Sequence, residues 1–143
     1  MGLMKDGLAS PTALVNLKTI PGLDGIHSRR DGLHIGALVT LARLAMLDGP
    51  QGLREAAASA ASPQLRNMGT LGGNLLQKPR CWYFRNQHVP CWRKGGRRCF
   101  AFRGENKYHT IFGGGPCFAP HPSDLAVALL ALDASVLLVG PYG

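Results

Sequence analysis

Acidic side chains, long apolar runs and, outside one window, cysteines are scarce in this sequence of 143 residues. The longest apolar run, residues 125–132, is far shorter than the about 20 residues that cross a bilayer, so we predict no membrane span. Residues 1–10 lack the apolar core of a signal peptide. We therefore expect the chain in the cytoplasm, or in the periplasm if a partner subunit directs its export.

The scarcity of acid leaves an excess of positive charge, because 16 Lys and Arg are offset by 8 Asp and Glu. This excess is concentrated between Lys78 and Lys107, where Glu105 is the only acidic residue. Such a region can bind nucleic acid, an anionic cofactor, an acidic partner subunit or a thiolate-ligated metal centre. Its aromatic residues do not follow the pattern of RNA-binding modules, so we predict no nucleic-acid partner.

The spacing of apolar and turn residues predicts an α+β fold, in which helices pack against a small, mostly antiparallel sheet. The expected elements, in chain order, are strands at 13–17 and 33–37 paired as a hairpin, helices at 41–47 and 51–60, a helix from Ser123 to about Leu132, and a strand at 134–139. Thr40 is the expected N-cap of the first helix. The last helix is apolar on every side, which predicts that it is largely buried. Residues 62–121 show little periodicity, and a stretch of that length needs a staple.

Four cysteines lie in that irregular stretch, at Cys81, Cys91, Cys99 and Cys117, and none lies elsewhere. The spacing C-x9-C-x7-C-x17-C lacks the paired CxxC knuckles of zinc ribbons and the compact run of bacterial ferredoxins. From spacing alone, four interpretations remain open: two disulfides, a structural zinc site, an iron–sulfur cluster, or four unrelated thiols. His88 and His109 lie in the same window and are interpreted as surface residues rather than ligands.

Two turns flank the cysteine window. The first, residues 67–74, is rich in glycine and could present several backbone N–H groups to a phosphate or another anion, with the Thr70 hydroxyl as a further donor. It could also be a tight turn without a ligand. In the second turn, Asp124 starts the apolar helix, where its carboxylate either interacts with the helix N-terminus or accepts hydrogen bonds from ligand hydroxyls.

Taken together, three segments resemble the FAD-binding subunits of the xanthine dehydrogenase family of molybdenum hydroxylases. They are the early Leu33-His-Ile-Gly-Ala37, the run from Ala61 to Asn74, and His121-Pro-Ser-Asp124 with the helix that follows. The cysteine window narrows the resemblance to the flavin subunits of the periplasmic aldehyde oxidoreductase and 4-hydroxybenzoyl-CoA reductase type. Those subunits have a cysteine-bearing loop with a [4Fe–4S] cluster.

The resemblance implies a set of site residues. Thr70 and Asp124 would contact FAD, and Gly72, Gly73 and Asn74 would line its pocket through their backbone and amide groups. The [4Fe–4S] ligands would be the four cysteines, in a loop spanning residues 78–120. No residue of the chain would act as acid, base or nucleophile in the substrate chemistry.

The resemblance also implies an architecture and a role. Residues 1–143 would form the central part of a PCMH-type FAD-binding domain, without the N-terminal segment that binds the FAD pyrophosphate and without the C-terminal domain. The function would be electron transfer in a molybdenum-dependent oxidoreductase, alongside a large subunit with the molybdenum cofactor and a small subunit with [2Fe–2S] centres. The alternative is a zinc-stapled basic binding module without enzymatic activity.

Overall fold

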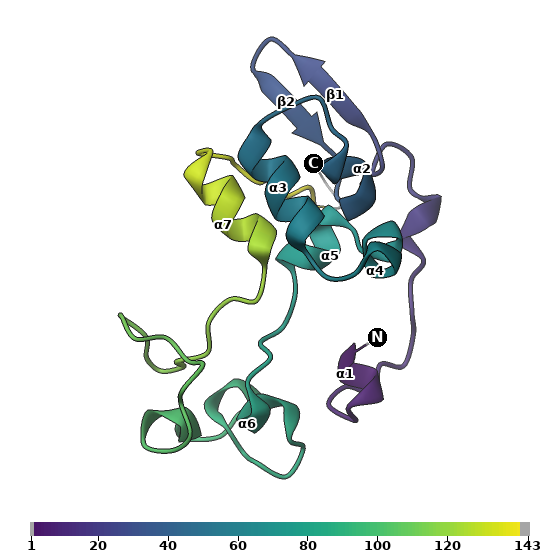
Figure 1. Cartoon of the computed structure of the whole chain (residues 1–143). Helices are drawn as coiled ribbons and strands as arrows, with labels where there is room; N and C mark the ends of the chain where they lie inside the picture. The colour runs from purple at the N-terminus through teal and green to yellow at the C-terminus, as the bar shows by residue number, and fades with distance from the viewer. Residues whose placement is uncertain (1, 141–143) are drawn as a thin grey trace. The chain divides into compact units, whose positions relative to one another are not determined.

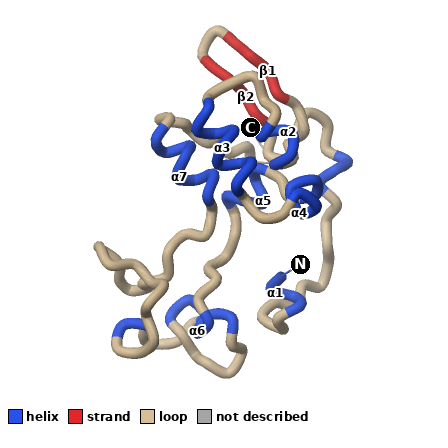
Figure 2. The backbone as a smooth tube through the Cα atoms, viewed as in Figure 1, coloured by secondary structure: helices blue, strands red, loops and turns tan. Residues whose placement is uncertain are grey.

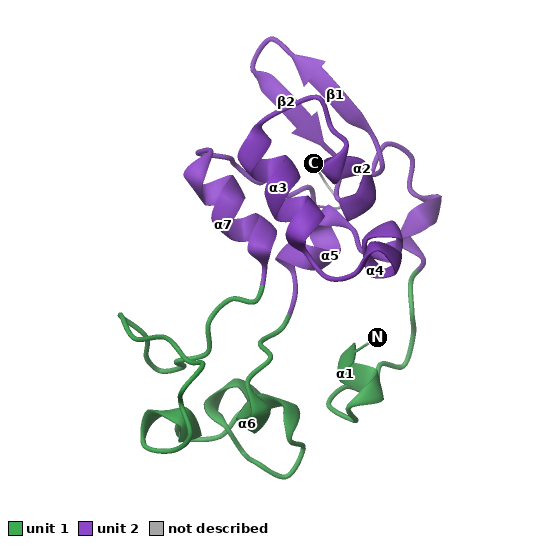
Figure 3. Ribbon diagram, in the orientation of Figure 1, with its two compact units in different colours: residues 1–15, 78–122 green, residues 16–77, 123–143 purple. Residues whose placement is uncertain are grey.

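The computed structural model describes residues 2–140, which form two compact units. Unit 1 comprises residues 1–15 and 78–122, and unit 2 comprises residues 16–77 and 123–143 (Figure 3). Short helices and one two-stranded antiparallel sheet make up the regular structure (Figures 1 and 2). The α+β prediction is therefore confirmed. Within the described residues, no helix has both the length and the apolar character needed to cross a membrane.

The sheet of unit 2 is a hairpin of β1 (Ile26–Arg29) and β2 (Gly32–Ile35). The predicted hairpin exists, but its first strand is wrong, because residues 13–17 form no strand and β1 lies nearer in sequence to β2. At the hairpin turn, a hydrogen bond from His34 lowers the pKa of the Asp31 carboxyl from its ordinary value. The short loop between β1 and β2 costs less entropy to close than the longer loop from residues 13–17 to β2 that we expected, so β1 is the favoured partner of β2.

Five helices of unit 2 surround a single apolar core. They are α2 (Leu41–Ala45), α3 (Gln51–Ser59), α4 (Pro63–Met68), α5 (Leu71–Leu75) and α7 (Asp124–Ala131), with the short 3-10 helix η1 (Leu17–Thr19) before the hairpin. The buried core residues are Val39, Leu41, Leu44, Leu53, Ala57, Ala60, Leu71 and Leu125. Helix α3 packs against α2 and α7, with the small Ala57 fully buried. The predictions of α2, of its Thr40 cap and of α3 are confirmed.

Helices α4 and α5 lie where the sequence predicted little regular structure. Ser62 caps α4 by accepting a hydrogen bond from the Leu65 N–H, and Pro63 is the first helical residue. Both residue types favour a helix start, so this signal was present in the sequence. Helix α5 includes two glycines, which have low helix propensity, and its position depends on tertiary contacts.

Two predictions for the end of unit 2 are wrong. Helix α7 is buried on one face only, because Leu125 is fully buried whereas Leu130 is 82% exposed. Residues 134–139 were predicted to form a strand, but up to residue 140 the described chain has no strand after β2. The aliphatic side chains of residues 136–139 remain exposed. A strand needs a neighbour that supplies backbone hydrogen bonds, and the apolar pattern alone cannot provide one.

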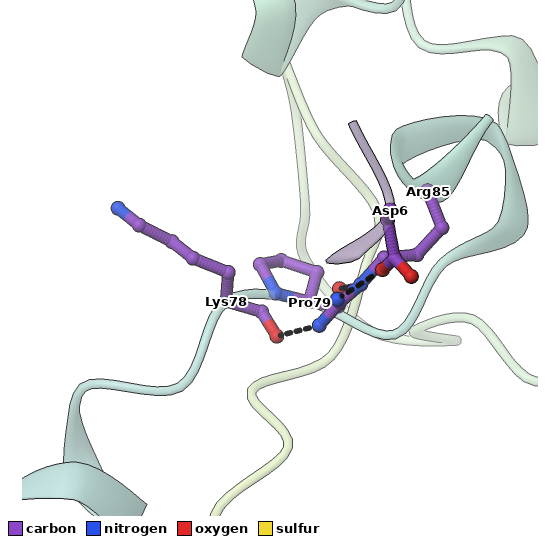
Figure 4. A network of polar contacts seen from close by, with 4 residues as sticks. All are labelled: Asp6, Lys78, Pro79 and Arg85. Atoms are coloured by element: carbon purple, nitrogen blue, oxygen red, sulfur yellow. Dashed lines mark hydrogen bonds and ion pairs between the residues drawn. The ribbon is translucent and has the colours of Figure 1, made fainter. Parts of the chain in front are cut away.

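Unit 1 has only short helices, α1 (Gly2–Lys5), α6 (Trp82–Arg85) and the 3-10 helices η2 (Trp92–Lys94) and η3 (Phe100–Phe102). The Arg85 guanidinium connects its two chain segments (Figure 4). It donates to the Asp6 carboxylate at 2.8 Å and to the backbone carbonyls of Pro79 and Lys78 at 2.9 and 3.4 Å. The Arg85 side chain thus provides hydrogen-bond donors to backbone carbonyls that have no partner in a helix or sheet.

Candidate functional site

The glycine-rich turn of unit 2 is the start of helix α5. The Thr70 hydroxyl accepts a hydrogen bond from the Gly73 N–H at 3.2 Å and thereby caps the helix. The N–H groups of Leu71 and Gly72 donate to the carbonyls of Val39 and Ala37 at 2.9 and 2.8 Å. The predicted array of open N–H donors is therefore wrong for these positions, because the chain itself uses these donors.

Gly72 and Gly73 differ in what their missing side chains allow. A Cβ atom at Gly72 would lie 3.0 Å from both the Cβ and the carbonyl oxygen of Ala37, which is closer than ordinary van der Waals contact. At Gly73, such a Cβ would also lie 3.0 Å from its nearest atom, but that atom is the side-chain hydroxyl oxygen of Thr70 rather than backbone, and the residue is exposed. Close packing therefore accounts for Gly72, while Gly73 leaves backbone surface open beside Thr70.

The two turns that flank the cysteine window meet in unit 2. The Ser123 hydroxyl donates to the side-chain oxygen of Asn74 and accepts from the Ala126 N–H, so it joins the end of α5 to the start of α7. Asp124 follows at the first position of α7 and is exposed. The Asn74 amide thus has a packing role, and the exposed Asp124 carboxylate remains accessible to a ligand.

In unit 1, all four cysteine thiols line one small cavity, together with aromatic residues that include Tyr83, Phe84 and Phe100. Cys81, Cys91 and Cys99 each immediately precede a short helix, α6, η2 and η3 respectively. Cys91 is buried, and the other three are partly exposed. Local helix starts therefore bring together thiols that are far apart in the sequence.

The side-chain nitrogens of Arg93 and His109 lie close to two of these sulfurs. The Arg93 Nε donates to the Cys117 sulfur at 3.0 Å. The His109 Nε2 lies 3.2 Å from the Cys81 sulfur, while its Nδ1 is buried without a hydrogen-bond partner. These contacts place one guanidinium nitrogen and one ring nitrogen beside two of the four sulfurs. The prediction that His109 is a surface residue is wrong, whereas His88 is exposed.

The donor set distinguishes the interpretations that the spacing left open. All four cysteines are free, so the two disulfides are absent. In a zinc site with Zn–S bonds of about 2.3 Å, the sulfurs would lie about 4 Å apart. Within residues 2–140, no group of three or more Cys, His, Asp or Glu side chains is placed to bind one metal ion.

All four cysteines line one cavity, and an iron–sulfur cluster has separate irons for its four thiolate ligands. The cavity itself has a volume of about 10 Å³. This volume is roughly that of one water molecule, so a cluster would require the cysteine-bearing turns to move apart. Those turns are irregular and mostly lack the ladder hydrogen bonds that would oppose such a movement.

The family of FAD-binding domains in molybdopterin dehydrogenases matches residues 1–143. The chain belongs to this family. It is 40% identical to the aldehyde oxidoreductase FAD-binding subunit of Escherichia coli (strain K12) over 150 residues, which cover 100% of this chain and 47% of that protein. The alignment therefore includes the cysteine window. The chain thus spans about half the length of that relative.

Other members of the molybdopterin dehydrogenase FAD-binding family match over shorter lengths. The nicotinate dehydrogenase FAD-subunit of Eubacterium barkeri is 33% identical over 50% of this chain and 26% of that protein. The carbon monoxide dehydrogenase medium chain of Afipia carboxidovorans is 40% identical, also over 50% of this chain and 26% of that protein. These relatives are subunits of oxidoreductases. Membership of a family of FAD-binding domains favours the flavin interpretation over the alternative of a zinc-stapled binding module.

Proposed function

We propose that this chain is part of an FAD-binding electron-transfer subunit of a molybdenum-dependent oxidoreductase of the aldehyde and xanthine dehydrogenase type. The observation that supports this most directly is the match to a FAD-binding subunit along the whole chain, including the cysteine window. When bound, FAD takes up and passes on electrons. The protein contributes the binding, the orientation and the electrostatic environment of the flavin.

The residues proposed for FAD are Thr70, Gly72, Gly73, Asn74 and Asp124. A hydrogen bond between Ser123 and Asn74 connects the two segments in which these residues lie. Asp124 offers an exposed carboxylate that can accept hydrogen bonds from ligand hydroxyls. Gly73 is exposed in α5, which packs against α7. Thr70 has its hydroxyl oxygen occupied by the Gly73 N–H, so its hydrogen remains the group available to a ligand.

The flavin proposal is tested on the complete subunit, purified with its partners. We expect flavin absorbance at cofactor stoichiometry, and about tenfold weaker FAD binding for Asp124→Ala, because one charge-assisted hydrogen bond is lost. Asp48→Ala, which removes an exposed carboxylate at the end of the loop after α2, is the control and should bind FAD normally. A complete subunit without flavin, or equal binding by both variants, would contradict the proposed role.

We further propose that Cys81, Cys91, Cys99 and Cys117 bind a [4Fe–4S] cluster. The convergence of all four thiols on one cavity supports this, as do the nitrogen donors of Arg93 and His109 beside two of them. When bound, such a cluster exchanges single electrons. Arg93 and His109 would then stabilise negative charge on sulfur, and the surrounding aromatic rings would limit the access of water.

The cluster proposal is tested by metal and sulfide analysis of anaerobically purified protein. We expect iron and labile sulfide at cluster stoichiometry, and loss of the cluster spectrum in Cys99→Ser. Stoichiometric zinc without iron would overturn the proposal, and an unchanged spectrum in the variant would remove Cys99 from the ligand set. Co-purification tests the partners that we propose, a large subunit with the molybdenum cofactor and a small subunit with [2Fe–2S] centres. Fractionation distinguishes a cytoplasmic from a periplasmic complex.

A further inference from the structure

A second and larger cavity lies in unit 1. Its volume is about 640 Å³, and its lining residues include Gly7, Lys78, Phe84, Trp92, Arg93 and Lys94. This volume is within the range of roughly 300–1,000 Å³ typical of small-molecule sites. None of the residues proposed for FAD, and none of the four cysteines, lines it.

The lining has positive charge that the chain does not neutralise. The Lys78 backbone carbonyl accepts from Arg85 (Figure 4). The Lys78 ammonium group makes no hydrogen bond or ion pair among residues 2–140. Arg93 donates from Nε to Cys117, and its two terminal nitrogens have no partner in the described part of the chain. Lys94 donates to the backbone carbonyl of Asn86, which is a neutral acceptor. No acidic residue lines the cavity.

The same cavity has an aromatic wall. Trp92 is 43% exposed, so part of its indole is open to solvent, and the buried Phe84 is a further aromatic lining residue. A planar ring can stack on an exposed indole, while the two terminal nitrogens of an arginine suit the paired oxygens of a phosphate or carboxylate. Cations and an open aromatic surface therefore occur together in a space of ligand size.

We propose that this cavity is a binding site for a small organic anion that has a planar ring. The anionic group would interact with Lys78, Arg93 and Lys94, and the ring would lie against Trp92. A nucleoside phosphate and an aromatic carboxylate share this chemistry. The site shares no lining residue with the proposed flavin site, and it shares Phe84, Trp92 and Arg93 with the cysteine cavity.

The experiment is isothermal titration calorimetry of the complete subunit with FAD bound, so that the flavin site is already filled. The probes are ADP, benzoate and inorganic pyrophosphate. Comparison of ADP with benzoate distinguishes a phosphate ligand from a carboxylate ligand, and comparison of ADP with pyrophosphate shows whether the ring contributes to binding. We expect at least one ring-bearing anion to bind. Lys78→Ala should weaken this binding about fivefold. Because the Lys78 ammonium makes no hydrogen bond or ion pair within the described part of the chain, this variant should fold normally.

Two further variants complete the test. Lys107→Ala removes one cation from the same unit, outside the cavity, and should bind the anion as the wild type does. Trp92→Leu should weaken binding of the ring-bearing anion and leave pyrophosphate binding unchanged. No binding of either ring-bearing probe at millimolar concentration, or equal effects of Lys78→Ala and Lys107→Ala, would overturn the proposal. Flavin absorbance of the same samples reports separately on the proposed function.

Discussion

The two units of this chain are stabilised in different ways. Unit 2 buries a cluster of aliphatic side chains among five helices, whereas the buried hydrophobic residues of unit 1 are Phe84, Cys91 and Ala101. Unit 1 depends instead on polar contacts, above all those of Arg85, and on four thiols around one cavity. A small apolar core contributes little free energy of folding, so unit 1 is expected to depend on the cluster that we propose for it, and unit 2 is not.

The largest effect is expected from opening the core of unit 2. Leu44→Ala removes a fully buried side chain and should lower the free energy of unfolding of unit 2 by about 2–5 kcal/mol. The measurement is urea denaturation, followed by hydrogen exchange of α2 and α3. Met46→Ala, at an 87% exposed position, is the control and should change stability by less than about 0.5 kcal/mol. Equal effects would show that unit 2 has no packed core.

Removal of iron from the anaerobic protein tests whether unit 1 depends on the cluster that we propose for it. We expect trypsin to cut within residues 78–122 at least about tenfold faster, because the cysteine-bearing turns lose their common ligand while unit 2 keeps its core. Mass spectrometry of the fragments locates the cuts against time. Cleavage that rises equally in residues 16–77 would show that the two units do not differ in this way.

Arg85→Ala is expected to have an intermediate effect. It removes donors to two backbone carbonyls and the ion pair with Asp6, which is about one third exposed, so we expect a loss of about 1–3 kcal/mol in unit 1. Hydrogen exchange of residues 78–86 measures the change. Arg97→Ala, at an exposed position in the same basic region, should leave this exchange unaltered.

The smallest effect concerns the hairpin turn of unit 2. The hydrogen bond from His34 lowers the pKa of Asp31, so this carboxyl stabilises the fold above its ordinary pKa, and that contribution disappears as the pH falls through the lowered value. Asp31→Asn should therefore lose less stability than the wild type over this acidic range. Urea midpoints at a series of pH values test this, with Asp24→Asn as the control. Identical acid dependence in Asp31→Asn and the wild type would contradict it.

The sequence predicted those parts of the fold that depend on local signals. The Thr40 cap and the periodicity of residues 51–60 were sufficient for α2 and α3. The strands at 13–17 and 134–139 were wrong because an apolar pattern does not specify a pairing partner. The expected full burial of α7 failed for a related reason, since its outer face has no neighbour among the described residues.

Those parts of the candidate site that belong to sequence motifs could be predicted, whereas the parts that depend on tertiary contacts could not. The family, the flavin segments and the cysteine window were recognisable from residue order. The contacts of Arg93 and His109 with sulfur were not, because 24 and 28 positions of irregular chain separate the partners. The capping role of Thr70 was accessible from the sequence, since a threonine before a helix is a common N-cap.

Arg93 presents one guanidinium group to two cavities. Its Nε interacts with the Cys117 sulfur, and its terminal nitrogens are available to an anion. By thermodynamic linkage, an anion that draws on this group changes the stability of negative charge on the sulfur. Conversely, a ligand that binds at the Cys117 sulfur changes the affinity of the cavity for the anion, and the factor equals that by which the anion changes the affinity at the sulfur. This reciprocity needs no movement of the backbone, because the two interactions share a single delocalised cation.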